Sequence, residues 1–142
     1  MKRRAMAAGL LASVSAHAEA PGQIGFDGLY KSFGVRGLVF SDAVMALNQR
    51  PVRMTGYMAP PLKAESNFFV LTREPLALCP FCQSDADWPV DIVVIYLRRQ
   101  SPLVDAGARI TVVGRLETGS WIDPDSGFVS QLRIVEATFR TG

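Results

Sequence analysis

The chain alternates apolar and polar residues with a period of two after Arg50, and this pattern constrains its fold more than any other feature. Residues 52–58 have Val, Met, Gly and Met at even positions and Arg, Thr and Tyr at odd ones, and residues 110–116 repeat the alternation. This spacing predicts β-strands with one buried face. Residues 68–72, 91–97 and 128–138 complete a set of five expected strands, and 91–97, apolar on both faces, should be central.

Two glycines and one turn indicate how these strands are arranged. Gly56 and Gly114 lie inside strands, where a small barrel has to bend sharply. Residues 123–127 (Asp-Pro-Asp-Ser-Gly) have the chemistry of a hairpin turn, because Pro presets φ and Gly accepts a positive φ. We therefore expect a mostly β fold, a five-stranded OB-like Greek-key barrel over residues 51–142 preceded by a short α-helix, with a β-sandwich as the alternative.

The first eighteen residues have the three parts of a bacterial signal peptide. A basic start at residues 2–4 is followed by an apolar stretch over residues 5–14, and Ala16-His17-Ala18 has the small-x-small pattern that signal peptidase recognises. We expect cleavage near Ala18 and a periplasmic protein. The apolar stretch is about half the roughly 20 residues that span a bilayer, so the mature chain should not cross the membrane.

Export changes the charge balance of the chain. The signal peptide contains three of the fifteen lysines and arginines and the only histidine, so residues 19–142 hold twelve basic against thirteen acidic side chains, a net charge of −1. Binding to a phosphate backbone relies on surplus cations, so no nucleic-acid partner is expected. Loss of His17 excludes histidine-based triads, general bases and metal sites from the mature chain.

Residues 19–50 are expected to form an irregular arm and a short helix. Five glycines between positions 22 and 37 interrupt any periodicity. Ser41 has the chemistry of a helix N-cap, with Phe40 placed to pack against Met45. Pro51 disfavours helical geometry at the residue before it, so the helix should end near Gln49.

Three segments and a cysteine element resemble an uncharacterised (domain-of-unknown-function) family of exported bacterial proteins with an OB-like domain. The segments are 52–60 (Val-Arg-Met-Thr-Gly-Tyr-Met-Ala-Pro), 68–71 (Phe-Phe-Val-Leu) and 110–116 (Ile-Thr-Val-Val-Gly-Arg-Leu). The resemblance implies an accessory role beside an ABC-type export or metal-uptake system, with a periplasmic or inner-membrane transport component as partner. Many members of that family carry a His- and Pro-rich stretch after the first cysteine, where this chain has Phe81-Cys82 and no histidine.

Cys79-Pro80-Phe81-Cys82 is the element most able to carry chemistry. In an oxidising compartment two cysteines at this spacing form a local disulfide by default, which would pin the loop before the 91–97 strand. The pair can instead act as a redox dithiol, with Cys79 as nucleophile and Cys82 as resolving thiol. Only six residues separate Cys82 from Pro89, too few for the helix that lowers the thiol pKa in thioredoxin-like enzymes.

A metal contact is the third interpretation of this cysteine pair. Cys79 and Cys82 supply half of a tetrahedral zinc site. The remaining ligands would come from a second chain or from nearby carboxylates, namely Asp85, Asp87 or Glu65. Copper(I) also accepts thioethers, which brings in Met54 and Met58, although both fall on the apolar face of a strand, where methionine usually fills a core.

The sequence therefore favours a periplasmic binding or accessory protein over an enzyme, with zinc and copper as the candidate cofactors. The alternative is a periplasmic thiol-disulfide oxidoreductase that uses Cys79 and Cys82. A further alternative is a barrel face that binds an oligosaccharide or a peptide, with Trp88 and Trp121 as stacking platforms or as covers of a barrel end. The sequence contains no phosphate loop, dinucleotide fingerprint or serine nucleophile motif.

Overall fold

The computed structural model describes residues 20–32, 37–59, 67–75, 91–99 and 108–141, and it is mostly β with one short α-helix, as expected. The elements are β1 (Gly22–Gln23), a 3-10 helix (Phe26–Gly28), β2 (Tyr30–Ser32), β3 (Val39–Phe40), α1 (Asp42–Leu47), β4 (Pro51–Met58), β5 (Phe68–Thr72), β6 (Ile92–Leu97), β7 (Arg109–Ile122) and β8 (Val129–Thr141). In these ranges, no helix is both long and apolar enough to cross a membrane.

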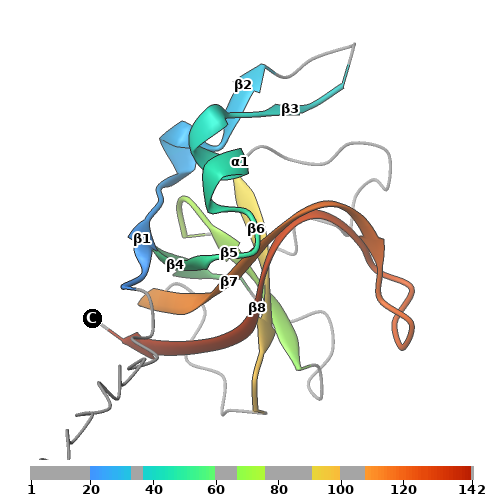
Figure 1. The fold of residues 1–142 in the computed structure, drawn as a ribbon. Coiled ribbons are helices and arrows are strands. Elements are labelled where there is room, and N and C mark those ends of the chain that lie inside the picture. The colour runs from blue at the N-terminus through green and yellow to red at the C-terminus, as the bar shows by residue number, and fades with distance from the viewer. Residues whose placement is uncertain (1–19, 33–36, 60–66, 76–90, 100–107, 142) are drawn as a thin grey trace, which may run out of the picture.

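The strands from β4 to β8 pair in a ring. Antiparallel pairs join β4 to β5 and β5 to β6, a parallel pair joins β6 to β8, and antiparallel pairs join β8 to β7 and β7 back to β4. Only the first half of β7 pairs with β4, so the far half of the β7–β8 hairpin is two-stranded. Figure 1 shows this hairpin as a long, strongly curved ribbon whose turn projects to one side.

The main core is formed by the inward faces of these strands. The even-numbered apolar residues of the 52–58 and 110–116 alternations supply much of it, as the period-two pattern predicts. Met54 and Met58 are 0% and 1% exposed and pack among aliphatic side chains, so both are core residues. A second apolar cluster covers the opposite face of β5 and β6, and it consists of Ala59, Phe68, Val70, Ile92, Val94 and Tyr96. Both faces of β6 are therefore buried, which confirms the prediction of a central strand.

The two strand glycines lie where neighbouring backbones approach closely. A Cβ atom on Gly56 would lie 2.7 Å from the carbonyl oxygen of Thr72, and one on Gly114 would lie 2.7 Å from that of Val135. The β7–β8 register also shifts between Val113 and Arg115, on either side of Gly114. A side chain at either glycine would push adjacent strands apart.

Residues 19–37, expected to form an irregular arm, contain two short strands, β1 and β2. β1 pairs in parallel with β4, and β2 pairs with β3 in a separate two-stranded sheet. Ile24 and Leu29 are buried in the main core, at 6% and 0% exposure. These strands have only two or three residues each, too few to produce a visible period in the sequence.

The helix begins as predicted. The Ser41 hydroxyl accepts a hydrogen bond from the Val44 N–H at 3.2 Å, which is the N-cap contact. Met45 is 52% exposed, whereas Phe40 stacks on Tyr30 at a ring separation of 5.5 Å, so the aromatic partner of Phe40 is on β2. The helix ends at Leu47, and Gln49 has a left-handed backbone with φ of 66°.

Candidate functional site

The cysteine element lies outside the described residues. The two cysteines, the candidate carboxylate ligands and one of the two tryptophans are therefore not described: Cys79, Cys82, Asp85, Asp87, Glu65 and Trp88. The disulfide, the metal contact and the redox dithiol therefore stay predictions. Within the described ranges, no group of three or more His, Cys, Asp or Glu side chains is placed to hold a metal ion.

The described residues bring together a different polar group, on the outer face of β4, β7 and β8. The odd-numbered residues of β4 and β7 and the even-numbered residues at the end of β8 face outward here, and the strand register aligns them in rows across the three strands. One row holds Arg53, Val113 and Thr138, and the next holds Thr55, Thr111 and Arg140. We call this surface the arginine face.

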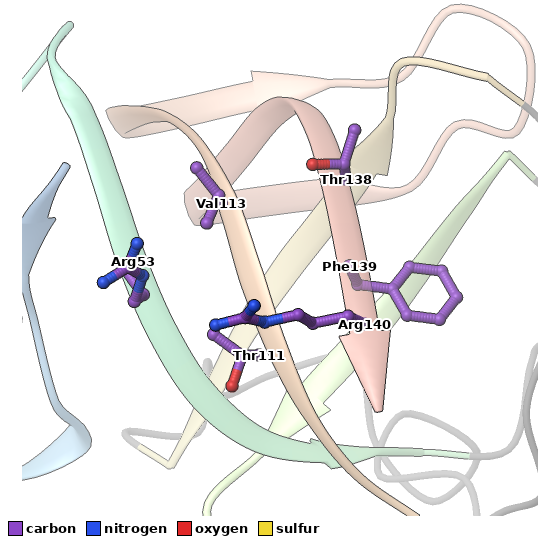
Figure 2. A pocket seen from close by; sticks show the side chains of 6 residues that line it. All are labelled: Arg53, Thr111, Val113, Thr138, Phe139 and Arg140. Carbon is purple, nitrogen blue, oxygen red and sulfur yellow. The ribbon is translucent and has the colours of Figure 1, made fainter. Parts of the chain in front are cut away.

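A shallow hollow of about 290 Å³ opens on the arginine face. Its lining is Arg53, Thr111, Val113, Thr138, Phe139 and Arg140. Figure 2 shows the Arg140 side chain running from β8 across β7, so that its guanidinium group lies beside Thr111, whereas the ring of Phe139 points the other way. Arg53 approaches the hollow from β4, on the side opposite β8.

The arginines of this face differ from other arginines of the chain in their electrostatic partners. Arg115 lies 3.6 Å from Glu117 and 3.5 Å from Glu136, so its charge is balanced locally. In the described part of the chain, Arg53, Arg109 and Arg140 have no carboxylate within ion-pairing distance. Among the residues that the structure describes, no carboxylate therefore balances the charge of Arg53 and Arg140 beside the hollow.

Two threonine hydroxyls lie in the middle of this charge. The Oγ1 atoms of Thr55 and Thr111 are 3.1 Å apart and share one hydrogen bond. Thr111 is only 8% exposed although it faces outward. Guanidinium N–H groups and hydroxyls donate hydrogen bonds to the oxygens of carboxylate, phosphate and sulfate, and one arginine can donate two such bonds to the same anion. The arginine face is thus chemically suited to an anion.

A second hollow, of about 280 Å³, adjoins the first at the end of β8. It is lined by Arg98, Arg99, Ala137, Thr138 and Phe139, so it shares Thr138 and Phe139 with the first hollow. Arg98 and Arg99 follow directly after β6 and are both exposed. Both arginines therefore lie at the border of this hollow.

The far half of the β7–β8 hairpin holds a separate polar cluster. The Tyr96 hydroxyl donates to Asp123 Oδ2 at 3.2 Å, and the N–H groups of Asp125 and Ser126 donate to Asp123 Oδ1 at 2.8 and 3.4 Å. Burial raises the pKa of Tyr96, and the neighbouring Asp123 charge raises it further. Burial also raises the pKa of Asp123, but these hydrogen bonds outweigh it and hold that pKa below its usual value. The cluster fixes the hairpin turn.

Arg133 completes this cluster and is 5% exposed. Its Nε donates to Glu117 Oε1 at 3.1 Å, its Nη1 donates to the Gly119 carbonyl at 2.8 Å, and its guanidinium lies 5.4 Å from the ring centroid of Trp121. Trp121 also packs edge-on against Tyr96, with ring centroids 5.2 Å apart. These contacts join the two strands of the hairpin, so Trp121 is packed into the hairpin although 39% of it is exposed.

The candidate site residues predicted from the sequence did not include Arg53 and Arg140. Arg53 occupies an outward position of the predicted 52–58 strand, which is the only signal that the sequence carries for it. Arg140 lies beyond the predicted 128–138 strand, because β8 continues to Thr141. Their approach depends on the β4–β7 and β7–β8 registers, which set Arg53 beside Val113 and Arg140 beside Thr111.

Comparison with known proteins bears on the fold. No protein-family model matches the chain. No curated protein matches it either. Among solved structures, the chain is similar to the crystal structure of a DUF3299 family protein from Pseudomonas aeruginosa PAO1, with 11% sequence identity and a TM-score of 0.55. The match covers 87% of this chain and 97% of that chain, so the two proteins share a fold over most of their lengths.

Proposed function

We propose that this chain is an exported OB-like binding module that holds an anionic ligand on its arginine face. The ring of strand pairings supports the OB-like part, because it has five strands, antiparallel neighbours and one parallel pair between β6 and β8. The order of basic, apolar and small residues in the first eighteen positions supports export to the periplasm. An accessory role beside a transport system is supported by the family resemblance.

One observation carries the choice of ligand. Arg53 and Arg140 border one hollow from opposite sides, and neither has a carboxylate partner in the described residues. A guanidinium group that bonds an anion in two places gains geometric specificity as well as charge. Because the hollow is shallow and open to solvent, each contact contributes less than it would in a buried site.

The cysteine element has a supporting role in this proposal. In this proposal, Cys79 and Cys82 form a structural disulfide or a metal contact. Anion binding on the arginine face uses neither cysteine. The binding function therefore persists when the two thiols are replaced, whereas the thiol-disulfide oxidoreductase alternative requires both.

The test is an NMR titration of the purified protein with citrate, inorganic phosphate and sulfate at low ionic strength. We expect amide shifts centred on Thr111 and Arg140, with the strongest binding for the ion that engages both arginines. Arg53→Gln and Arg140→Gln should each weaken binding about tenfold, the effect of losing one charge-assisted hydrogen bond of roughly 1.5 kcal/mol. Arg140→Lys keeps the charge but loses the planar fork, so it should recover only part of the affinity.

The matched control is Lys31→Gln, which removes one exposed positive charge from β2, outside the arginine face. It should leave the dissociation constants unchanged within about twofold, because its interaction with a distant anion is screened by salt. The proposal fails if Lys31→Gln weakens binding as much as Arg140→Gln, or if none of the three anions shifts residues of the arginine face.

A further inference from the structure

Among the described residues, the end of β8 has a neighbouring strand on one side only, and we call its other side the open edge. β6 pairs with β8 only as far as Leu97 and Ala137, and the last bond of this pairing runs from the Arg98 N–H to the Ala137 carbonyl at 2.9 Å. β8 continues to Thr141, paired with β7 on its other side. Among the described residues, no strand lies beside residues 139–141 on the side that β6 has left.

The backbone direction along β8 shows which groups face this edge. Successive residues of a strand point their N–H and C=O groups to opposite sides. The Ala137 carbonyl points toward β6, because it accepts from Arg98, so the groups of Phe139 and Thr141 point to the same, open side. Backbone groups of this kind are strong donors and acceptors, and an edge that presents them can pair with another extended chain.

The second hollow lies at this edge and supplies side-chain chemistry. Arg98 and Arg99 border it from the end of β6, and Arg140 lies on the adjoining face of β8. The side chains of β8 alternate here: Thr138 and Arg140 face outward, whereas Phe139 faces the core and packs against Phe69 with ring centroids 5.5 Å apart. A strand added beside β8 would alternate in the same way, since side chains on one face of paired strands lie side by side.

We propose that the ligand of the arginine face is an extended acidic segment of a partner protein, which adds as a strand to the open edge of β8. This inference rests on the proposed function and names the ligand class. Acidic side chains at every second position of the segment lie beside Arg140 and Arg98, and an apolar side chain between them lies beside Phe139. Backbone hydrogen bonds to Phe139 and Thr141 supply affinity, and the arginines supply specificity. The open edge is about 10 Å long at 3.3 Å per residue, so three to four residues of the partner pair with it.

The first experiment uses a blocked hexapeptide of alternating Asp and Val as the probe. We expect hydrogen exchange at the Phe139 and Thr141 amides to slow at least about tenfold at saturation, because each amide gains a partner. Two further peptides carry N-methyl groups on every second amide: one peptide is methylated at the odd-numbered residues and the other at the even-numbered residues. Only the peptide whose methylated positions face β8 should lose binding, by about tenfold or more, while the other binds within about twofold of the parent. A peptide with Lys in place of Asp should not bind detectably.

The second experiment changes the edge of the protein. Thr141→Pro removes one N–H from the open edge and leaves β7 pairing in place, so it should weaken the peptide roughly fivefold, the effect of about one net hydrogen bond. Thr141→Val keeps the N–H and should bind as wild type. Citrate binding should be the same in both variants, and equal melting temperatures would show that both are folded.

The outcomes separate this inference from the proposed function. If both N-methyl peptides bind equally while citrate still binds, strand addition is wrong and anion binding stands. If neither citrate nor the peptide binds, both proposals are wrong. Binding of the Lys peptide would exclude an acidic partner. If protection of Phe139 rises with protein concentration in the absence of peptide, the edge pairs with a second copy of this chain, and the acidic partner is again excluded.

Discussion

Gly114→Ala is the substitution that most directly tests the close strand packing under the arginine face. A Cβ at this position would lie 2.6 Å from Ile134 Cγ2, 2.7 Å from the Val135 carbonyl oxygen and 3.0 Å from Ala137 Cα. Two of these three atoms belong to the backbone of β8 and cannot move aside by changing a rotamer. β7 and β8 would have to separate at the point where their register shifts.

The expected cost follows from these contacts. Overpacking of a tight site costs about 1–3 kcal/mol, and the upper part of this range applies because backbone atoms must move. Replacing Gly by Ala also lowers the entropy of the unfolded chain, which offsets about 0.4–1 kcal/mol. The net loss in free energy of unfolding is therefore about 2 kcal/mol, which for a chain of this length lowers the melting temperature by roughly 6–10 °C.

Gly28→Ala is the matched control. No atom lies within 4 Å of a Cβ built on Gly28, and its backbone does not need the left-handed region. Thermal unfolding and urea denaturation should place this variant within about 0.5 kcal/mol of wild type. If Gly114→Ala matched Gly28→Ala, β7 and β8 would not approach as closely as described. The geometry of the hollow, which depends on that approach, would then be wrong.

Three further predictions concern the hairpin cluster and the cysteines. The pKa of Asp123 is held low, so the stabilisation by its carboxylate is present above the usual Asp pKa of about 3.9 and is lost as pH falls below that value. In urea denaturation, Asp123→Asn should lower the free energy of unfolding at pH 7 by about 1 kcal/mol. It should also weaken the pH dependence of that free energy between about pH 4 and 2. Arg133→Met should lower the free energy of unfolding by about 2–3 kcal/mol, less than the loss of a fully buried ion pair, because its partner Glu117 is partly exposed. The same substitution should shift the fluorescence of Trp121 to longer wavelength. The reduction potential of Cys79 and Cys82 should lie below about −300 mV if their bond is structural, and a value in the range of known thiol-disulfide catalysts would favour the oxidoreductase.

The strands were predictable where side-chain burial alternates or is continuous. Residues 52–58, 68–72 and 91–97 were each located to within a residue or so, because one or both faces of these strands are buried and apolar. β7 extends to Ile122, six residues beyond the predicted 110–116. The far half of β7 pairs only with β8, and Arg133 of β8 donates hydrogen bonds to Glu117 and to the Gly119 carbonyl. No hydrophobic period marks such a segment. The sequence therefore predicts the strands that enclose a core and underestimates those that leave it.

The arginine face could not be predicted for a related reason. Alternation in residues 52–58 predicts that Arg53 points away from the core, but it applies equally to every outward residue of that strand. Arg140 lies beyond the predicted strand 128–138, and an unbroken period from the buried Leu132 and Ile134 would point it inward. The register shift near Glu136 moves the buried positions to Ala137 and Phe139, so that Arg140 faces outward. What distinguishes these two is register, which a single residue of slip would change and which only the pairing of three strands determines. The open edge of β8 likewise depends on where β6 ends relative to its neighbour. The pattern within a single strand predicts most of its buried residues. The residues of this candidate site depend on how several strands align, so they can be identified only when the pairing of those strands is known.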